Sequence, residues 1–213
     1  MDFCFYLITD RHATAGGKGI EYVLDRAFEA GVRGVLLREK DLPERELLDL
    51  ARRVREMTRL HGVRFLVSGR VDIALAVDAD GVHIGGSSLP APAAKRLMGE
   101  DRYLAVSTHS LAEARAAQDA GADFVTFGPV YSTPSKAKYG PPVGLDALRE
   151  VCRELSIPVF ALGGIRPDNA ADALAAGAYG VAAISAVIGA PDPALAVRNF
   201  IDTMRGYKLG RVV

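Results

Sequence analysis

The chain has 213 residues, and its 26 lysines and arginines balance its 26 aspartates and glutamates, so the formal net charge at pH 7 is zero. This length suits one domain with a sizeable core, or at most two small ones. The charge balance gives no reason to expect nucleic acid or an anionic membrane as a partner. No apolar run approaches the roughly 20 residues of a membrane span, and the N-terminus lacks the basic start of a signal peptide. We therefore expect a cytoplasmic protein.

One pattern recurs along the chain: a helix that ends in small residues and glycine, followed by a short apolar strand. It appears as EAGVRGVLLRE (29–39), VDADGVHIGG (77–86), DAGADFVTFGP (119–129) and AAGAYGVAAIS (175–185). Glycine at a helix end suits a left-handed cap, and a continuous apolar run suits a strand that is buried on both faces. Strands that alternate with helices in this way predict parallel βαβ units.

In chain order, the pattern predicts eight strands, each followed by a helix. We expect the strands at residues 3–9, 33–38, 63–67, 80–84, 103–107, 123–127, 158–162 and 180–184. We expect the helices at residues 20–30, 43–61, 71–78, 90–98, 110–120, 144–154, 168–176 and 192–205. Without a long linker or a break in composition, the eight pairs favour an α/β fold with a single (β/α)8 TIM barrel over residues 1–213. An open doubly wound sheet is the alternative, and the tail 206–213 has no pattern that we can assign.

In such a barrel the active site lies at the carboxyl ends of the strands. Arg38 and Lys40 follow the second predicted strand two residues apart, so the twofold period of a strand points both into the barrel mouth. Glu39 would face the other way. Two cations at the mouth suit an anionic group or an electron-rich ring; a solvated charge run is the alternative.

The segment ALGGIRPDNA (161–170) contains the clearest phosphate signal. Gly163 and Gly164 close a buried strand and expose backbone N–H groups, and Asp168 can cap the helix behind them. The loops after the seventh and eighth strands are the usual phosphate position in these barrels, and AAISAV (182–187) adds Ser185 to that position. A tight turn that serves only packing is the alternative.

The connection from 127 to 144 is long for a loop between a strand and a helix. Loops of this length are usually lids or binding loops. Thr133, Ser135 and Lys136 offer two hydroxyls and a cation that suit a phosphate, and Lys136 would complete an anionic site with the two cations of the second strand. An inert surface loop is the alternative.

Two histidines are candidates for acid–base chemistry. His83 ends a strand among small residues, where a satisfied interior role is the alternative. His109 begins a helix close to two serines, where a capping role is the alternative. No group of histidine, cysteine and carboxylate residues has zinc spacing, and no serine–histidine–acid arrangement is present. The residue pattern therefore predicts no metal site.

Taken together, these segments resemble the thiamin phosphate synthase and TenI family. The matching fragments run in order along nearly the whole chain: YLITDR, LREK, DGVHIG, VSTHS, FGPVY, TPSK, GGI, PDNA and AISA. The resemblance implies a (β/α)8 barrel, usually a homodimer, that acts in thiamin biosynthesis on a small phosphorylated heterocycle such as thiazole phosphate or thiamin phosphate. The synthase joins a hydroxymethylpyrimidine diphosphate to a thiazole phosphate and releases pyrophosphate with help from Mg²⁺. TenI shares the barrel and the thiazole phosphate site but is an aromatising thiazole tautomerase.

The family's functional residues can be carried over by motif. Arg38 and Lys40 would contact the diphosphate and the pyrimidine. The residues that would line the phosphate groups are Ser107, Thr133, Ser135 and Lys136. The residues that would hold the thiazole phosphate are Gly163, Gly164, Ile184 and Ser185. Ser68 and Arg70, which follow the third strand, are further candidates for substrate binding.

The chain departs from the synthase pattern at the positions of the magnesium ligands. The synthases carry Asn-Asp followed by Asp or Arg, with the middle Asp a ligand, where this chain has Ser68, Gly69 and Arg70. The second ligand ends a HIGQED stretch, which here reads HIGGSS and ends in Ser88. Leu36 also replaces the Gln that begins the family's QLREK. Because Mg²⁺ usually keeps one or two carboxylate ligands, we expect Mg²⁺-dependent synthesis to be absent or strongly impaired, with Mg²⁺ a cofactor only if the chain is a synthase.

These departures favour a TenI-like protein, of isomerase or ligand-handling type, because TenI has Asn-Gly-Arg where this chain has Ser-Gly-Arg. The catalytic histidine of TenI follows the FG of the sixth strand, where this chain has Pro129. An isomerase would then use His109 or His83. Two alternatives stay open: a thiamin phosphate synthase in which side-chain cations replace part of the metal's charge, and a non-catalytic binder of a thiamin intermediate.

Overall fold

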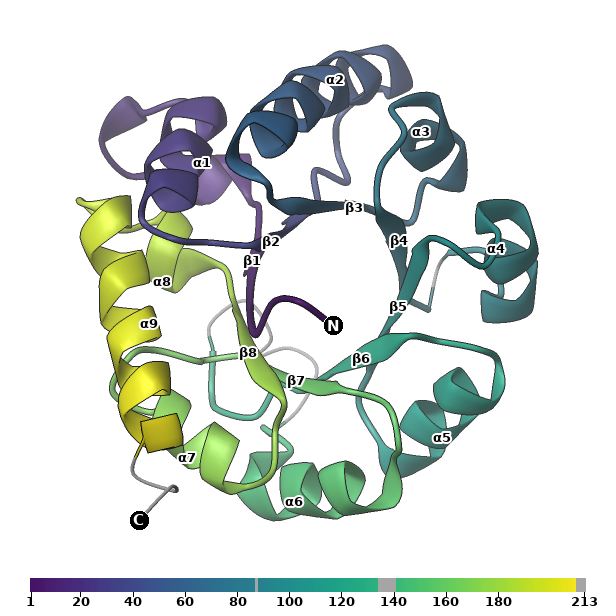
Figure 1. Cartoon of the computed structure of the whole chain (residues 1–213), viewed down its shortest axis with the longest axis vertical. Coiled ribbons are helices and arrows are strands. Elements are labelled where there is room, and N and C mark those ends of the chain that lie inside the picture. Colours follow the sequence, from purple (N-terminus) through teal and green to yellow (C-terminus); the bar gives the residue numbers. More distant parts are fainter. Residues whose placement is uncertain (87, 134–140, 210–213) are drawn as a thin grey trace.

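The computed structural model describes residues 1–86, 88–133 and 141–209. Its strands are β1 (Phe5–Ile8), β2 (Gly34–Leu37), β3 (Arg64–Ser68), β4 (Gly81–Ile84), β5 (Tyr103–Thr108), β6 (Phe124–Phe127), β7 (Val159–Leu162) and β8 (Gly180–Ala183). Each strand pairs in parallel with the next one in sequence, and β8 pairs with β1, so the sheet closes into a barrel that helices surround (Figure 1). The predicted (β/α)8 TIM barrel is confirmed.

All predicted helices are present around the barrel. They are α1 (Ile20–Glu29), α2 (Glu44–His61), α3 (Val71–Ala76), α4 (Ala91–Met98), α5 (Leu111–Asp119), α6 (Gly144–Glu154), α7 (Ala170–Ala175) and α9 (Pro193–Leu209). The sequence pattern does not predict the short α8 (Ser185–Ile188) or the 3-10 turns η1 (Arg11–Ala13) and η2 (Ala15–Gly17). Part of the unassigned tail continues α9, where Tyr207 Oη donates to the carbonyl of Leu174 at 3.1 Å. Within the described ranges, none of the helices has the length and apolar character needed to cross a bilayer.

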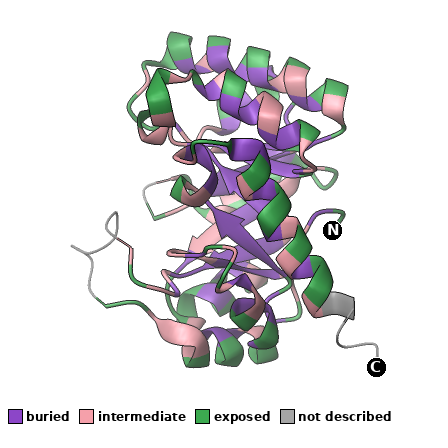
Figure 2. Ribbon diagram, turned by 90° about the vertical axis from the view of Figure 1, so that its left-hand side faces the viewer, coloured by how far each residue is buried: buried purple, intermediate pink, exposed green. Residues whose placement is uncertain are grey.

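Two apolar cores lie on the two faces of the closed sheet, because successive residues of a strand point to opposite sides. Inside the barrel the buried side chains are Phe3, Tyr6, Ile8, Leu36, Leu66, Ala105, Phe124, Phe160 and Ala182. The alternate positions, such as Leu7 and Leu37, pack against the surrounding helices. Figure 2 shows the result, with buried strands between helices that are exposed on their outer side. Burial on both faces explains why the strands read as continuous apolar runs.

The N-terminal segment closes the amino end of the barrel, and Figure 1 shows it crossing the opening. The ring of Phe3 lies 5.5 Å from the rings of Tyr6 and Phe160 and 5.9 Å from that of Phe124. Gly34 makes room for this ring, since a Cβ at that position would lie 2.5 Å from Phe3 Cδ2. An aromatic layer therefore fills the amino end, which leaves the carboxyl end for polar side chains.

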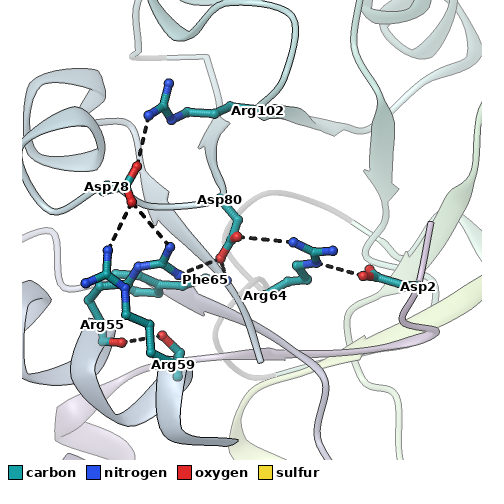
Figure 3. Close-up of polar contacts among 9 residues, drawn as sticks. Asp2, Arg55, Arg59, Arg64, Phe65, Asp78, Asp80 and Arg102 are labelled. Carbon is teal, nitrogen blue, oxygen red and sulfur yellow. Dashed lines mark hydrogen bonds and ion pairs between the residues drawn. The ribbon is translucent and has the colours of Figure 1, made fainter. Parts of the chain in front are cut away.

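A network of ion pairs holds the same amino end together on the outside (Figure 3). Asp80, just before β4, accepts hydrogen bonds from Arg55 at 2.7 Å, from Arg64 at 3.3 Å and from the backbone N–H of Phe65 at 2.9 Å. Arg64 also donates to Asp2 at 2.7 Å. These contacts tie α2, β3 and the loop before β4 to one another. Polar groups at this end of a barrel contribute stability rather than chemistry.

Candidate functional site

A buried polar cluster lies inside the barrel, in contact with the aromatic layer and toward the carboxyl ends of the strands. His83 on β4 lies between Tyr6 of β1 and Ser107 of β5. Its Nδ1 is 3.3 Å from Tyr6 Oη, and its Nε2 is 2.9 Å from Ser107 Oγ and 3.4 Å from Thr126 Oγ1. The strand register brings the hydroxyls together, since Ser107 on β5 is paired with Thr126 on β6. His83 is therefore a satisfied interior residue, the alternative considered for it above.

The imidazole of His83 is uncharged at neutral pH. Burial, together with the positive charges of Arg38 and Lys40, lowers the pKa of His83 to about 3. A group with so low a pKa is a weak base, far from the match with ambient pH that general acid–base catalysis needs. The structure thus argues against His83 as the proton-transfer group of an isomerase.

This shift in pKa makes the free energy of unfolding depend on pH. Below pH 6.5 the unfolded chain binds a proton at His83, whereas the folded chain does not bind it until about pH 3, so stability falls as the pH decreases through this window. The expected loss is about 1.4 kcal/mol per pH unit, or about 2 kcal/mol at pH 5. Urea unfolding of the wild type and of His83→Gln at pH 7 and pH 5 measures the difference. Equal losses in the two proteins would contradict this assignment.

Arg38 and Lys40 follow β2 at the carboxyl end of the barrel. Their charges both act on His83, so both lie near the polar cluster. The side chain of Arg38 is half-buried, and among the described residues its guanidinium has no hydrogen-bond or ion-pair partner. Because buried cations are otherwise almost always paired, the arrangement favours an anionic ligand at this position.

Glu39 faces away from the mouth, as the twofold period predicts. Its carboxylate is buried and accepts a hydrogen bond from the backbone N–H of Arg11 to each oxygen, both at 3.1 Å. The guanidinium of Arg11 adds a contact at 3.3 Å. Glu39 therefore joins the end of β2 to the turn after β1, and this contact sets the position of its two cationic neighbours.

The glycine pair after β7 is required by close packing. The φ angle is 94° at Gly163 and 66° at Gly164. A Cβ at these positions would lie 2.5 Å from Pro129 Cα and 2.7 Å from the carbonyl oxygen of Ser132, respectively. The backbone N–H groups of the pair have no hydrogen-bond acceptor among the described residues. Packing thus explains the glycines, and the same geometry leaves two N–H groups available to an anion.

Asp168 does not cap the helix that follows the glycine pair, in contrast to the prediction. The N-cap of α7 is Asn169, which makes no side-chain capping bond. The side chain of Asp168 pairs instead with Arg166 at 3.1 Å. Asn169 accepts from the backbone N–H of Arg166 at 2.8 Å and donates to the carbonyl of Gly164 at 3.0 Å. Asn169 therefore shapes this loop because an amide can both donate and accept.

The predicted residues after β3 differ in their surroundings. Ser68 is half-buried and paired in register with His83. The guanidinium of Arg70 is bonded to Asp72 at 2.5 Å and to Glu44 at 3.3 Å. Since its charge is already balanced within the protein, Arg70 is a weaker candidate for a phosphate than Arg38.

The remaining predicted phosphate residues lie in the loops after β6 and β8. Thr133 and Ile184 are half-buried, whereas Ser185 is exposed at the first position of α8. Ser135 and Lys136 lie outside the described residues.

His109 follows β5 and is half exposed, with 51% of its side chain accessible. Glu113 accepts from the backbone N–H of His109 at 2.8 Å and lies 3.1 Å from its Nδ1. Ser110 is the N-cap of α5 and accepts from the backbone N–H of Glu113 at 3.2 Å. This arrangement resembles a capping box in which Ser110 is the cap, so His109 contributes only its contact with Glu113.

Positions 69 and 88 lie side by side at the ends of β3 and β4. Gly69 has a φ of 71°, and a Cβ there would lie 3.1 Å from Ser88 Oγ. Ser88 in turn accepts from the backbone N–H of Gly85 at 3.1 Å. In the described part of the chain, no three or more histidine, cysteine or acidic side chains form a cluster that could hold a metal ion. A glycine and a hydroxyl lack the carboxylates that Mg²⁺ usually keeps, so the residues present do not fit the metal site that the resemblance implies.

The search for polar residues at the carboxyl ends of the strands missed two members of the polar cluster, Tyr6 and Thr126. Both lie inside strands rather than after them, at positions that read as part of an apolar run. The twofold period offered a signal, because Thr126 stands two residues after the inward-facing Phe124.

Comparison with known proteins identifies a family that matches most of the chain. The thiamine monophosphate synthase family matches residues 5–187, which include all the predicted site residues. The chain is 57% identical over 193 residues to the putative thiamine-phosphate synthase of Geobacter sulfurreducens. This match covers 91% of this chain and 90% of the Geobacter protein. It is 46% identical over 193 residues to the thiamine-phosphate synthase of Roseiflexus sp. RS-1. This match covers 91% of this chain and 81% of the Roseiflexus protein.

A solved structure extends the comparison to three dimensions. The thiamine phosphate pyrophosphorylase from Pyrococcus furiosus superposes with a TM-score of 0.88 at 36% identity, over 96% of each chain. Sequence and structure thus match the same family over nearly the whole chain. On these grounds, the chain belongs to the thiamine monophosphate synthase family.

Proposed function

We propose that the chain is a thiamin phosphate synthase, which joins a hydroxymethylpyrimidine diphosphate to a thiazole phosphate and releases pyrophosphate. The names of the relatives support this proposal over the TenI-like interpretation that the sequence departures favoured, and they correct that preference. The observation that carries the proposal is the half-buried guanidinium of Arg38, which has no acidic partner among the described residues. A planar cation in such a place suits the diphosphate of a substrate.

The proposed reaction makes negative charge grow on the leaving group. A carbon–oxygen bond to pyrophosphate breaks while a carbon–nitrogen bond to the thiazole forms. Arg38 and Lys40 would stabilise the charge on the departing oxygens, because both cations lie near the mouth before the reaction begins. Ser107 adds a hydrogen bond from its hydroxyl, and Lys136, outside the described residues, would add a third cation.

The second substrate would be held by its phosphate on the opposite side of the mouth. Support comes from the two N–H groups after β7 that have no acceptor among the described residues. Backbone N–H groups that converge in this way bind anions without a side-chain charge. The residues that we propose for the thiazole phosphate are Gly163, Gly164, Ile184 and Ser185, with Thr133 and, outside the described residues, Ser135.

The geometry offers little support for a tautomerase. His83 is a weak base because of its burial, and His109 is engaged with Glu113 at the start of α5. Pro129 stands where TenI has its catalytic histidine. Neither the buried His83 nor Pro129 is suited to shuttle a proton at neutral pH.

Purified protein incubated with both substrates tests the proposal, with thiamin phosphate as the measured product and with Mg²⁺ or a chelator added. Slow formation of thiamin phosphate that the chelator does not abolish is the expected result. Deuterium exchange into the thiazole without this product would indicate an isomerase instead. Saturable binding without exchange or product would indicate a binding protein.

We also propose that the protein is a homodimer. Light scattering, which measures its molar mass in solution, tests this proposal.

Arg38→Ala is expected to weaken the binding of inorganic pyrophosphate about tenfold, since a charge-assisted contact contributes roughly 1.5–3 kcal/mol. Calorimetric titration measures the affinity. Arg96→Ala, at an exposed position of α4, is the matched control and should bind as the wild type does. If both variants bind pyrophosphate equally well, Arg38 does not contact the diphosphate.

A further inference from the structure

We infer that His83 is a positioning residue for Ser107: Tyr6 holds the imidazole in the tautomer with hydrogen on Nε2, and this tautomer turns the serine hydroxyl toward an anionic oxygen at the barrel mouth. The inference deepens the proposed function and rests on it only for the identity of that anion. The three side chains come from β1 and from the neighbouring strands β4 and β5.

The orientation of the imidazole is fixed by its neighbours. The ring of His83 is stacked on that of Tyr6, with centroids 5.8 Å apart and planes 7° from parallel. The ring of Phe124 meets it edge-on, at 6.3 Å and 89°. With 3% of the residue exposed, the ring is held in one plane, so Nδ1 faces β1 and Nε2 faces β5 and β6.

The tautomer follows from the hydroxyl of Tyr6. This side chain is fully buried, and burial raises its pKa well above the usual value, so the hydroxyl keeps its proton. Among the described residues, His83 Nδ1 is the one polar partner of Tyr6 Oη, at 3.3 Å. A buried hydroxyl proton without an acceptor is costly, so Tyr6 donates to Nδ1. A neutral imidazole carries a single hydrogen, which then resides on Nε2.

The tautomer determines how the serine bonds. Nε2–H donates to Ser107 Oγ at 2.9 Å, while Thr126 Oγ1 is a longer contact at 3.4 Å. The serine hydroxyl, which accepts on this side, has its own hydrogen free for another partner. Ser107 is half-buried near the end of β5, on the side of the ring that is remote from the aromatic layer.

The charges around the cluster agree with a donor role for the serine. The titratable and charged groups that face His83 are Tyr6 from β1 and the cations Arg38 and Lys40 after β2. Both cations attract an anion to the mouth, and neither can accept a hydrogen bond from the serine. An anionic oxygen of the ligand is then the natural acceptor for the Ser107 hydroxyl.

Nuclear magnetic resonance reads the tautomer directly. In the full chain labelled with ¹⁵N-histidine, two-bond proton–nitrogen correlations distinguish the two ring nitrogens of each of the four histidines, and His83→Gln assigns the signals of His83. We expect hydrogen on Nε2 from pH 6 to pH 8, and loss of this preference in Tyr6→Phe. Hydrogen on Nδ1, or a charged ring, would overturn the inference. No substrate is needed, so this outcome is independent of the proposed function.

Binding of inorganic pyrophosphate tests the effect on Ser107. His83→Phe fills the site without an N–H donor and should weaken binding about tenfold, as Ser107→Ala should. His83→Gln places an amide N–H near the Nε2 position and should restore affinity to within about threefold of the wild type. The double variant His83→Phe/Ser107→Ala should bind no more weakly than Ser107→Ala alone. Additive losses, or failure of glutamine to rescue, would mean that His83 only fills space.

The activity and pyrophosphate binding of the wild type distinguish failure of the synthase proposal from failure of the proposed role of His83. If the wild type binds pyrophosphate but forms no thiamin phosphate, the synthase proposal fails while the role of His83 still stands on binding and tautomer. Far-ultraviolet circular dichroism of each variant confirms that the barrel is folded before its affinity is compared.

Discussion

Replacing Gly69 and Ser88 together with aspartate is expected to raise Mg²⁺-dependent formation of thiamin phosphate about a hundredfold, because a bound metal supplies several kcal/mol of charge stabilisation. The two positions are adjacent, since a Cβ at 69 would lie 3.1 Å from Ser88 Oγ. Two carboxylates introduced there would face the same cation. Aspartate is also among the few residues that tolerate the left-handed φ of 71° found at position 69.

The control for this gain is the uncharged pair Gly69→Asn/Ser88→Asn. It has nearly the same shape but only neutral oxygen ligands, so its turnover should stay near that of the wild type with or without Mg²⁺. Initial rates over a Mg²⁺ titration measure both variants. An equal gain in the asparagine pair, or no gain in the aspartate pair, would show that the missing carboxylates do not limit the rate.

Asp80→Asn is expected to lower the free energy of unfolding by about 3–5 kcal/mol, because it removes the carboxylate that pairs most closely with the largely buried guanidinium of Arg55. The side chains of Arg55 and Asp80 are 13% and 18% exposed, and their atoms meet at 2.7 Å. Asp80 also holds Arg64 and the backbone N–H of Phe65. Figure 3 shows these contacts converging on its carboxylate. For a chain of this length, such a loss lowers Tm by about 10 °C, which differential scanning calorimetry measures.

Asp78→Asn is the matched control, since it removes the same charge from the same network. The side chain of Asp78 is 62% exposed, and its partners include Arg59 and Arg102, each at 3.0 Å. Ion pairs on the surface contribute less than about 1 kcal/mol. The two substitutions should therefore differ clearly in Tm. Similar small effects would mean that water reaches Arg55 once its partner is lost.

The sequence by itself determined the architecture of the barrel. The eight strands and their helices have local causes: an apolar run of the right length, a periodic helix and, after helices such as α1, α2, α5 and α7, a glycine. These signals lie within a few residues of one another and need no partner elsewhere in the chain. The position of the site followed as well, because the carboxyl ends of parallel strands always meet on one face. Arg38 and Lys40 were found by that rule alone.

The tertiary structure decided which side chains meet and which of them stay without a partner. Tyr6 and His83 are 77 positions apart, and only closure of the sheet makes them neighbours. The pairing of β3 with β4 sets Gly69 against Ser88, and the packing of α2 beside β3 brings Glu44 to Arg70. Such contacts depend on the sum of many weak packing interactions around the whole barrel, and no local pattern encodes that sum. The short α8 depends on the same packing, which is why periodicity missed it.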